Sequence, residues 1–418
     1  MKIEQIINYQ LNKLPRVKKY IKRIYQLFMY IISKKEKSYG DIERITPKDE
    51  YEYFFGYYDK SPWDSTERYV LCMRARCTYK DVSPREPADI ILIDTKNSNI
   101  KILASTSTWN VQQGCMLQWL GPNFNEEIIY NDCIDNVYCS IILNIKTMKK
   151  RIINCPVYSV SQRGDFALTL DFSRLYNLRP GYGYYNIKEK TKDIKLPDET
   201  CIWKVNLRNG EIEDLLKYTD FASFKPRHEM EDKNSVHKVN HLMISPNGKR
   251  FMVLYRWFNG QRKYTRLITC DINGKNMYLL SDDDMVSHCY WKNDKEILAF
   301  ENKKKTGPGY YLMKDQTNEF KHCWTKLSND GHPSYSPNGK YVVTDSYPDR
   351  KRMQSIKIME NNKDYKEIVR VFSPFKYDND TRCDLHPRWD RKSEKICFDS
   401  VFEGKRALYV VKVDNKGE

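Results

Sequence analysis

One short pattern recurs through most of the chain: a β-rich run, a turn built on Pro, Asn, Asp or Gly, and a second β-rich run. Two copies are almost identical, HLMISPNGKRFMVLYRW from His241 and HPSYSPNGKYVVTDSYPD from His332. Looser copies are SHCYWKNDKEILAFEN, HPRWDRKSEKICFDSV and three upstream stretches. Each copy is typical of a β-hairpin, because Pro, Asn and Gly set the backbone angles of tight turns.

The spacing of these hairpins indicates the fold. Aligned on the turn, seven residues take equivalent positions: Tyr57, Met116, Val157, His241, His288, His332 and His386. Repeats of roughly 40 to 50 residues built on hairpins are typical of propellers. We predict an all-β chain that forms a seven-bladed β-propeller over residues 41–418. The longest interval, between Val157 and His241, leaves room for an insertion at about residues 175–200.

The two ends of the repeat region also fit together. After the seventh hairpin only one further strand, Ala407 to Val413, precedes the end of the sequence. The run from Ile42 to Phe55 lies before the first hairpin and can supply the missing strand. We therefore expect the N-terminal strand to close the ring, which leaves no long unpaired sheet edge.

Positive charge is concentrated at the beginning of the chain. The formal net charge is +16, and residues 1–40 contain ten Lys or Arg against two Glu. From Val17 to Ile32 apolar residues recur at spacings of three and four, which predicts a basic amphipathic helical arm over residues 1–40. We expect residues 1–38 to bind a membrane surface; the alternative is a helix packed on its own domain. Nucleic acid is not an expected partner.

Other features of the sequence predict where the protein works. The longest apolar stretch, Leu27 to Ile32, is far shorter than the ~20 residues of a membrane span. The first residues lack the apolar core of a secretory signal, and the twelve cysteines form no CxxC pair, which favours free thiols in a reducing compartment. These observations predict a cytoplasmic protein peripheral to the inner face of the membrane.

Four histidines share one repeat position: His241, His288, His332 and His386. Equivalent positions in successive blades are related by rotation about one axis, so these imidazoles should form a partial ring at the channel mouth. Converging neutral imidazoles suit Mn, Zn, Fe or Cu. We predict a divalent metal, Mn or Zn, at this ring. The alternatives are a metal-free, histidine-lined substrate site and histidines that only hydrogen-bond within their own blades.

The same rim should carry further ionisable groups, because the end of the second strand of an antiparallel hairpin lies beside the start of the first. The predicted substrate-binding residues are Arg74, Trp109, Gln113, Trp257, Asp345 and Asp399. The predicted catalytic residues are Arg256, His237 and His228, the last two from a stretch that leads into the fourth hairpin. The alternatives are core aromatics and solvated loops. RPGYGY at 179–184 is a weak candidate for phosphate binding through backbone N–H groups.

The repeated H-x-x-[WYI]-[SD]-P-x-G hairpin resembles propellers of the oligogalacturonide lyase and Tol-system type, across most of residues 50–415. GYYDKSPWD, WNVQQGCMLQWL, VYSVS and RPGYGY also resemble bacterial propeller proteins found near surface-polysaccharide genes. The lyase resemblance implies a divalent metal held by three histidines and a glutamine, and cleavage of uronate-containing oligosaccharides by β-elimination. It also implies an H-x-H pair of metal ligands, which this chain lacks.

These observations lead to one functional hypothesis and two alternatives. We expect a carbohydrate-active enzyme that acts on an acidic, lipid-linked oligo- or polysaccharide in cell-surface polysaccharide metabolism, by metal-assisted β-elimination. In that reaction a His-bound cation or Arg256 neutralises the uronate carboxylate, and a nearby His or Lys removes the C5 proton. The alternatives are a glycosyltransferase of polysaccharide biosynthesis and a non-catalytic propeller that binds a glycan or a protein.

Overall fold

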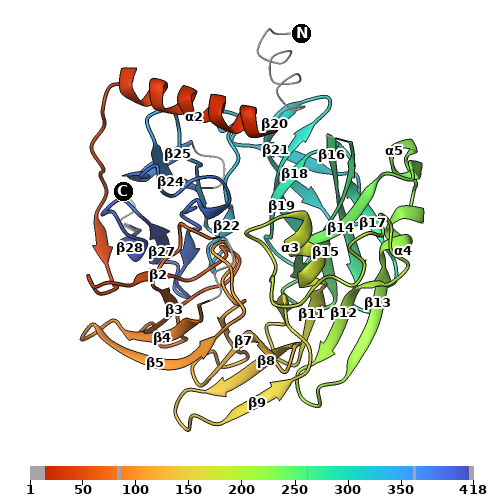
Figure 1. Cartoon of the computed structure of the whole chain (residues 1–418), viewed down its shortest axis with the longest axis horizontal. Helices are drawn as coiled ribbons and strands as arrows, with labels where there is room; N and C mark the ends of the chain where they lie inside the picture. The colour runs from red at the N-terminus through yellow and green to blue at the C-terminus, as the bar shows by residue number, and fades with distance from the viewer. Residues whose placement is uncertain (1–14, 82–85, 261, 361–363, 414–418) are drawn as a thin grey trace.

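The computed structural model describes residues 15–81, 86–260, 262–360 and 364–413. Seven four-stranded antiparallel sheets follow one another around a central axis (Figure 1). The predicted all-β, seven-bladed propeller is confirmed. The sheets are numbered here as blades 1 to 7 in the order in which the chain enters them.

The first three blades are formed by the chain from Glu52 to Lys217. Blade 1 consists of β2 (Glu52–Phe54), β3 (Tyr69–Ala75), β4 (Ala88–Asp94) and β5 (Asn99–Thr106). Blade 2 consists of β6 (Gln118–Trp119), β7 (Glu127–Ile134), β8 (Val137–Asn144) and β9 (Lys150–Ile153). Blade 3 consists of β10 (Ser159–Val160), β11 (Phe166–Leu170), β12 (Thr200–Asn206) and β13 (Ile212–Lys217).

The last four blades carry the repeat histidines. Blade 4 consists of β14 (Val236–Ile244), β15 (Arg250–Asn259), β16 (Arg262–Asp271) and β17 (Tyr278–Ser281). Blade 5 consists of β18 (Val286–Trp291), β19 (Glu296–Lys303), β20 (Gly307–Lys314) and β21 (Phe320–Cys323). Blade 6 consists of β22 (Ser334–Tyr335), β23 (Tyr341–Asp345), β24 (Met353–Glu360) and β25 (Tyr365–Phe372). Blade 7 consists of β26 (Arg388–Trp389), β27 (Lys395–Ser400), β28 (Ala407–Lys412) and β1 (Ile42–Arg44).

Blade 7 joins the two ends of the chain. β1 pairs antiparallel with β28, with Ile42 opposite Val411 and Arg44 opposite Tyr409. The rest of the 42–55 run does not belong to this strand, because Glu52–Phe54 forms the first strand of blade 1. The closing strand is therefore shorter than the sequence suggested.

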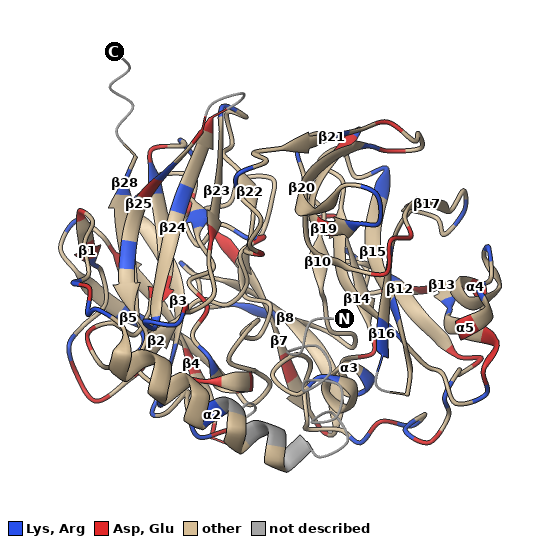
Figure 2. Cartoon of the chain, turned by 90° about the horizontal axis from the view of Figure 1, so that it is seen from above, with Lys and Arg blue, Asp and Glu red and all other residues tan. Residues whose placement is uncertain are grey.

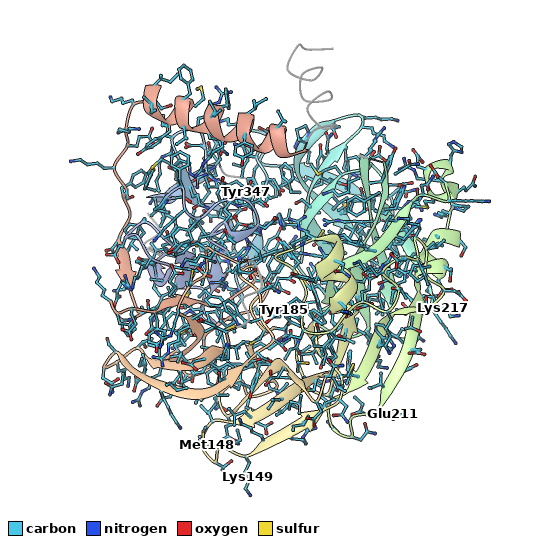
Figure 3. All side chains as sticks on the ribbon, in the orientation of Figure 1. Met148, Lys149, Tyr185, Glu211, Lys217 and Tyr347 are labelled. Atoms are coloured by element: carbon cyan, nitrogen blue, oxygen red, sulfur yellow. The ribbon has the colours of Figure 1, made fainter. Side chains whose placement is uncertain are left out.

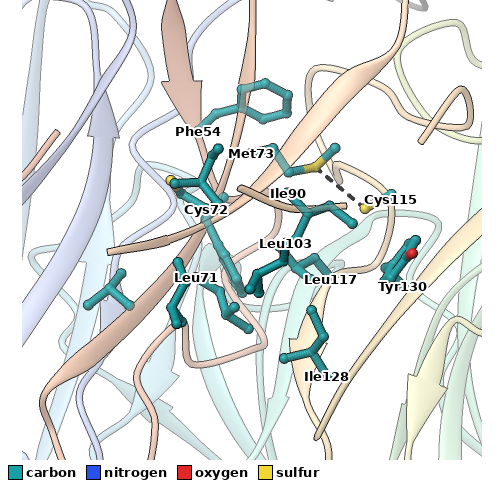
Figure 4. Close-up of a cluster of buried hydrophobic side chains, with 14 of the residues drawn as sticks. Phe54, Leu71, Cys72, Met73, Ile90, Leu103, Cys115, Leu117, Ile128 and Tyr130 are labelled. Atoms are coloured by element: carbon teal, nitrogen blue, oxygen red, sulfur yellow. Dashed lines mark hydrogen bonds between the residues drawn. The ribbon is translucent and has the colours of Figure 1, made fainter. Parts of the chain in front are cut away.

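Apolar packing between neighbouring blades holds the ring together. Each blade packs against a neighbour on both faces, so its inner strands are buried on both sides and do not alternate between apolar and polar residues. In β15, for example, seven consecutive residues are buried. Between blades 1 and 2, Met73 of β3 packs near Cys115, with its Sδ 3.6 Å from the cysteine Sγ (Figure 4). These interfaces give a rigid frame on which the mouth residues are mounted.

Helices are few in the part of the chain that the structure describes. They are α2 (Pro15–Ile32), α3 (Phe172–Leu178), α4 (Tyr218–Ser223), α5 (His228–Glu231) and a 3₁₀ turn (Asn379–Thr381). α2 and α3 lie on the same side of the propeller (Figure 2). Residues 1–14, the first part of the predicted arm, lie outside the described residues. Nowhere in the described ranges is there a helix long and apolar enough to cross a membrane.

The long connection between β11 and β12 contains the predicted insertion. It begins with α3, whose first turn is capped by Asp171, because the carboxylate accepts hydrogen bonds from the backbone N–H groups of Ser173 and Arg174. The remainder is irregular up to β12. Sequence patterns did not predict this short helix.

Candidate functional site

The four repeat histidines lie side by side at one end of the channel. The ring centroids of His241 and His288 are 6.4 Å apart, those of His288 and His332 are 4.1 Å apart, and those of His332 and His386 are 4.3 Å apart. All four side chains are buried. The backbone at His241 and His386 is left-handed, with φ of 60° and 44°, a conformation that non-glycine residues rarely adopt.

Tyr57, from the equivalent position of blade 1, fills the middle of this ring. Its ring centroid lies between 5.1 and 6.5 Å from those of all four histidines. The four imidazoles therefore cannot all converge on one point. His332 and His386 share the carboxylate of Asp345, whereas His241 and His288 line a neighbouring cavity, so the histidines are described as two pairs.

His332 and His386 form the first pair. The Nδ1 of His332 donates to Asp345, 2.8 Å from Oδ1, and the Nδ1 of His386 donates to the carbonyl oxygen of Gly56 at 2.9 Å. In its neutral form each imidazole therefore carries its lone pair on Nε2, and neither Nε2 has a hydrogen-bond partner although both are buried. Asp384 joins them: one donor atom from each of the three residues lies within 4.8 Å of the others.

The surroundings of this group fix its geometry. Asp345 accepts the backbone N–H of His332 at 2.8 Å and that of His386 at 3.1 Å, so one carboxylate positions both histidines. Arg382 holds Asp384 through two bonds of 2.5 and 2.8 Å. Burial keeps the pKa of His386 well below its usual value. Burial opposes charge on His332 as well, yet Asp345 raises its pKa.

His241 and His288 form the second pair. The Nε2 of His241 lies 3.0 Å from the Tyr58 hydroxyl and 3.2 Å from the Cys289 carbonyl, so this nitrogen is already engaged. Burial, and then the neighbouring His288, lower the pKa of His241 to about 3. His288 is held through Nδ1, which lies 3.0 Å from Asp330 Oδ1. Burial lowers the pKa of His288 too, so it is neutral near pH 7.

A cavity of about 230 Å³ opens beside the second pair. Arg256 of β15 lines it and is buried, yet its Nε has no hydrogen-bond partner and its Nη2 makes only a long 3.5 Å bond to the Val286 carbonyl. Burial, and then the neighbouring Arg179, lower the pKa of Arg256. Tyr347, labelled in Figure 3, borders the same cavity.

Two more cations line this cavity, Arg179 and Lys263. Arg256, and then burial, lower the pKa of Lys263 to about 8. Among the described residues, no carboxylate lies within ion-pair distance of Arg179, Arg256 or Lys263. Of the described residues in the lining, Asp330 alone is acidic, and it hydrogen-bonds His288. Three cations against one carboxylate leave the cavity with net positive charge, which suits an anion.

The glycine-rich RPGYGY motif supplies two of the lining residues, Arg179 and Tyr182. The Arg179 guanidinium lies 4.4 Å from the centre of the Tyr182 ring. Gly181 and Gly183 have φ of +92° and +75°, and a Cβ on Gly183 would lie 2.3 Å from the Phe172 carbonyl oxygen. These glycines let the loop turn tightly against α3. The motif thus contributes side chains to the site, and not the backbone anion cradle considered from the sequence.

Several predicted substrate-binding residues have other partners. Asp345 binds the histidines, and Asp399 pairs with the buried Arg388 at 2.9 Å. Arg74 pairs with Asp89 at 2.9 Å, and Trp109 is a core residue whose Nε1 donates to the Glu86 carbonyl. None of these lines the cavity. Each of these side chains has a partner within the protein, and its contact with a substrate stays a prediction.

The remaining predictions also fall away from the cavity. Gln113 donates to the Tyr158 hydroxyl, and Trp257 stacks on Tyr264 with centroids 5.1 Å apart. The Nδ1 of His237 lies 2.5 Å from the Tyr255 hydroxyl, and burial lowers the pKa of His237 to about 4. His228 begins α5 at the outer end of blade 4. Of the three predicted catalytic residues only Arg256 lines the cavity.

Sequence reasoning missed Asp384, Arg179, Lys263 and the central position of Tyr57. A signal for Asp384 was present, since the chain has Asp-Leu-His at 384–386. A search restricted to His-x-His overlooks a carboxylate that can serve as a ligand in the same place. Arg179 stands first in a motif that was singled out for its glycines. No pattern in the sequence predicts that Lys263 lies near Arg256.

Comparison with known proteins supports the fold. No protein-family model matches the chain, and no curated protein matches it. An oligogalacturonate lyase solved in complex with manganese is similar, with a TM-score of 0.67 and 14% identity over 91% of this chain and 96% of that one. An oligogalacturonate lyase from Vibrio parahaemolyticus has a TM-score of 0.64 and 12% identity, over 91% and 97%.

A third similar structure is the β-propeller domain of the trilobed protease from Pyrococcus furiosus, with a TM-score of 0.51, 11% identity and coverage of 87% and 97%. At these identities the likeness establishes the fold alone, because propellers host many unrelated chemistries. The resemblance to oligogalacturonide lyase propellers expected from the hairpin motif is thus confirmed at the level of architecture: the chain has the seven-bladed fold that these lyases share.

Proposed function

We propose that this protein is a carbohydrate lyase that cleaves an acidic, uronate-containing glycan by β-elimination. The observation that carries this proposal is the buried Arg256 guanidinium, which faces a cationic cavity without a carboxylate partner. A buried charge is costly unless it is paired, so an anionic ligand is the natural partner. The neighbouring pair of imidazoles with bare Nε2 atoms supports a cation-assisted reaction.

The residues present fit a divalent metal. Two buried, unpartnered imidazole nitrogens and one carboxylate form a donor set that suits Mn, Fe or Zn. His332, His386 and Asp384 would hold the ion, and Asp345 with the Gly56 carbonyl would orient the two rings. A bound divalent cation would neutralise the uronate carboxylate and so acidify the proton on C5. Manganese in a lyase of the same fold supports this assignment.

The chain's own residues account for the other requirements of the reaction. Arg256 and Lys263 bind and orient the carboxylate, while Tyr182 and Tyr347 border the cavity. His288 is placed to act as the base, since Asp330 holds its Nδ1 and leaves Nε2 to accept the C5 proton. The C5–H electrons form the C4–C5 double bond as the C4–O bond breaks. The departing glycosidic oxygen takes a proton from water.

We further propose that the substrate is a polymer of cell-surface polysaccharide metabolism. The cavity, which Arg179, Arg256 and Lys263 line, fits a glycan that carries carboxylates better than a neutral glycan. Oligogalacturonate, the substrate class in the names of two similar structures, is the first compound to test.

Absorbance assays with acidic oligosaccharides test this proposal. The purified full chain with Mn²⁺ is incubated with oligomers of galacturonate, glucuronate-containing repeats and mannuronate. At least one should give the ultraviolet absorbance of an unsaturated uronate. His288→Gln should lower kcat by at least about a hundredfold and leave KM within about threefold, because a general base acts on the reacting proton and not on binding.

The control is His322→Gln, since His322 of β21 stacks on Tyr311 of β20, away from the mouth. It should retain wild-type kinetics. Absence of unsaturated product from every oligomer, or turnover of a sugar-nucleotide donor in its place, would overturn the lyase assignment.

A further inference from the structure

The helix α2 is anchored to the propeller through one narrow side. Arg23 pairs with Asp378 at 3.1 Å, donates to the Phe375 carbonyl at 3.0 Å and lies 4.6 Å from the centre of the Phe375 ring. About two turns further on, the Tyr30 ring packs edge-on against Phe375, with centroids 5.3 Å apart. These contacts fix how the helix is rotated about its own axis.

The segment that follows α2 is tied to the same blade. Glu36 pairs with Arg370 at 2.6 Å and with Lys351. Tyr39 exchanges backbone hydrogen bonds of 2.9 and 3.0 Å with Arg370, and its hydroxyl lies 2.5 Å from Glu367. The helix is thus held at its middle, near its end and beyond its end, and cannot roll to bury a different side.

The side of α2 turned away from the propeller is apolar and uncovered. The exposed large apolar residues of this helix are Val17, Tyr20, Ile21, Ile24, Tyr25, Leu27, Phe28, Ile31 and Ile32, between 40% and 73% exposed. They make up nine of the nineteen exposed large apolar residues among those the structure describes. The other ten are distributed over several strands and loops, which is normal for a protein surface, but a continuous stripe on one helix marks an interaction site.

We propose that α2 lies in the surface of an anionic lipid bilayer, with this apolar stripe inserted among the lipid headgroups. Ten basic side chains against two acidic ones in residues 1–40 give the segment a strong attraction to anionic lipid. Tyr20 and Tyr25, both exposed, have the amphipathic rings that favour the headgroup level. An apolar stripe combined with basic residues is the pattern of a helix that lies in a membrane interface.

A second copy of this chain fits the stripe less well than a bilayer does. A two-fold interface would set the same basic segment against itself, so like charges would face each other. One face of an 18-residue helix also offers much less than the roughly 800 Å² per partner of a stable protein interface. A bilayer surface meets both difficulties, because it is anionic and extends along the whole helix.

Membrane binding would set the direction in which the site opens. α2 and α3 lie on the same side of the propeller (Figure 2), and α3 leads into the loop that lines the cavity. The segment under α2, containing Phe375 and Asp378, continues within ten residues to Asp384 and His386. The mouth would thus stay close to the lipid surface, where a lipid-linked glycan could reach it. The binding itself does not depend on which reaction the site performs.

Vesicle co-sedimentation of the full chain tests this inference. The probes are vesicles of phosphatidylcholine alone and of phosphatidylcholine with phosphatidylglycerol. The wild type should bind the phosphatidylglycerol vesicles at least tenfold more tightly, and the double variant Ile24→Glu, Phe28→Glu should lose at least tenfold in partitioning. The matched control is Ile152→Glu, Phe320→Glu, two residues about half exposed on β9 and β21, which should stay within twofold of the wild type.

A second readout keeps the test independent of that variant's folding. Phe28→Trp should show a blue shift of tryptophan emission when phosphatidylglycerol vesicles are added. Failure of the wild type to bind these vesicles, or an equal loss in the control variant, would overturn the proposal. So would a wild-type dimer in sedimentation velocity that the Ile24→Glu, Phe28→Glu variant converts to monomer.

Discussion

The two halves of the mouth start from the same repeat residue and reach different chemistry. In blades 6 and 7, His332 and His386 use Nδ1 to hold an acceptor and leave Nε2 bare. In blade 4, His241 uses Nε2 itself to contact Tyr58 and the Cys289 carbonyl. The repeat position places an imidazole at the mouth. The residues that hydrogen-bond its two nitrogens then decide whether Nε2 is free to bind a ligand.

A similar contrast separates two buried arginines. Arg388 is fully buried and pairs with Asp399 at 2.9 Å, while two of its nitrogens donate to the carbonyls of Tyr57 and Gly56. Arg256 is almost as buried but has no such partner. The first arginine is part of the frame of the propeller. The second has guanidinium N–H groups without a partner in the protein, and these can bind a ligand.

The largest effect should come from disrupting the pair His332 and His386, whose buried Nε2 atoms have no hydrogen-bond partner. His386→Gln removes one donor of the proposed metal group, and we expect the affinity for Mn²⁺ and the lyase activity each to fall by more than about a hundredfold. The thermal shift produced by Mn²⁺ should disappear with it. Differential scanning calorimetry with and without Mn²⁺ measures this without an assay of turnover.

The matched variant is His241→Gln, in which the Mn²⁺ shift should persist because His241 lies outside the donor group. Equal loss of the shift in both variants would mean that the four histidines act as one centre and that the division into two halves is wrong.

The next effect concerns the two arginines. Arg256→Met should reduce activity by tens of fold, since a hydrogen bond to a charged group contributes about 1.5–3 kcal/mol. It should leave the free energy of unfolding unchanged or higher, because an unpaired buried charge is removed. Arg388→Met should instead destabilise the fold by about 3–5 kcal/mol, because Asp399 is left buried without its partner. Urea unfolding of both variants compares them; a larger loss for Arg256→Met would contradict this assignment.

How far the sequence could predict the structure differs between frame and site. Turn residues and spacing repeat seven times, so each hairpin is an independent sign of the same fold, and errors in one do not affect the others. The site lacks this redundancy. Asp345 and Asp399 each pair with a cation at the start of their own hairpin, His332 and Arg388. The hairpin pattern places these groups on one rim, but it does not show whether they satisfy each other or face a ligand.

Residues outside the repeat were hardest to predict. Arg179 and Tyr182 reach the cavity because Gly181 and Gly183 let their loop fold back on α3. The sequence marked this segment by the glycines of RPGYGY and by the lack of a strand pattern, and neither feature places Arg179 at the cavity. Tyr57 occupies the place where the four histidines would otherwise meet, and its aromatic ring decides that they form two pairs. The spacing of the hairpins along the sequence does not show how much space a side chain such as Tyr57 occupies near the central axis of the propeller.

The smallest predicted effect is a change in how the anion affinity of the cationic cavity depends on pH. Arg256, and then burial, bring the pKa of Lys263 to about 8, so its charge is present below that pH and lost above it. Affinity for a uronate anion should therefore weaken as the pH rises from 7 to 9, by a factor of about three to ten for one lost charge contact. Lys263→Arg keeps its charge throughout this range and should flatten the profile. Isothermal titration with an oligogalacturonate at pH 7 and pH 9 measures the difference, and an equal decline in wild type and variant would show that Lys263 does not contact the anion.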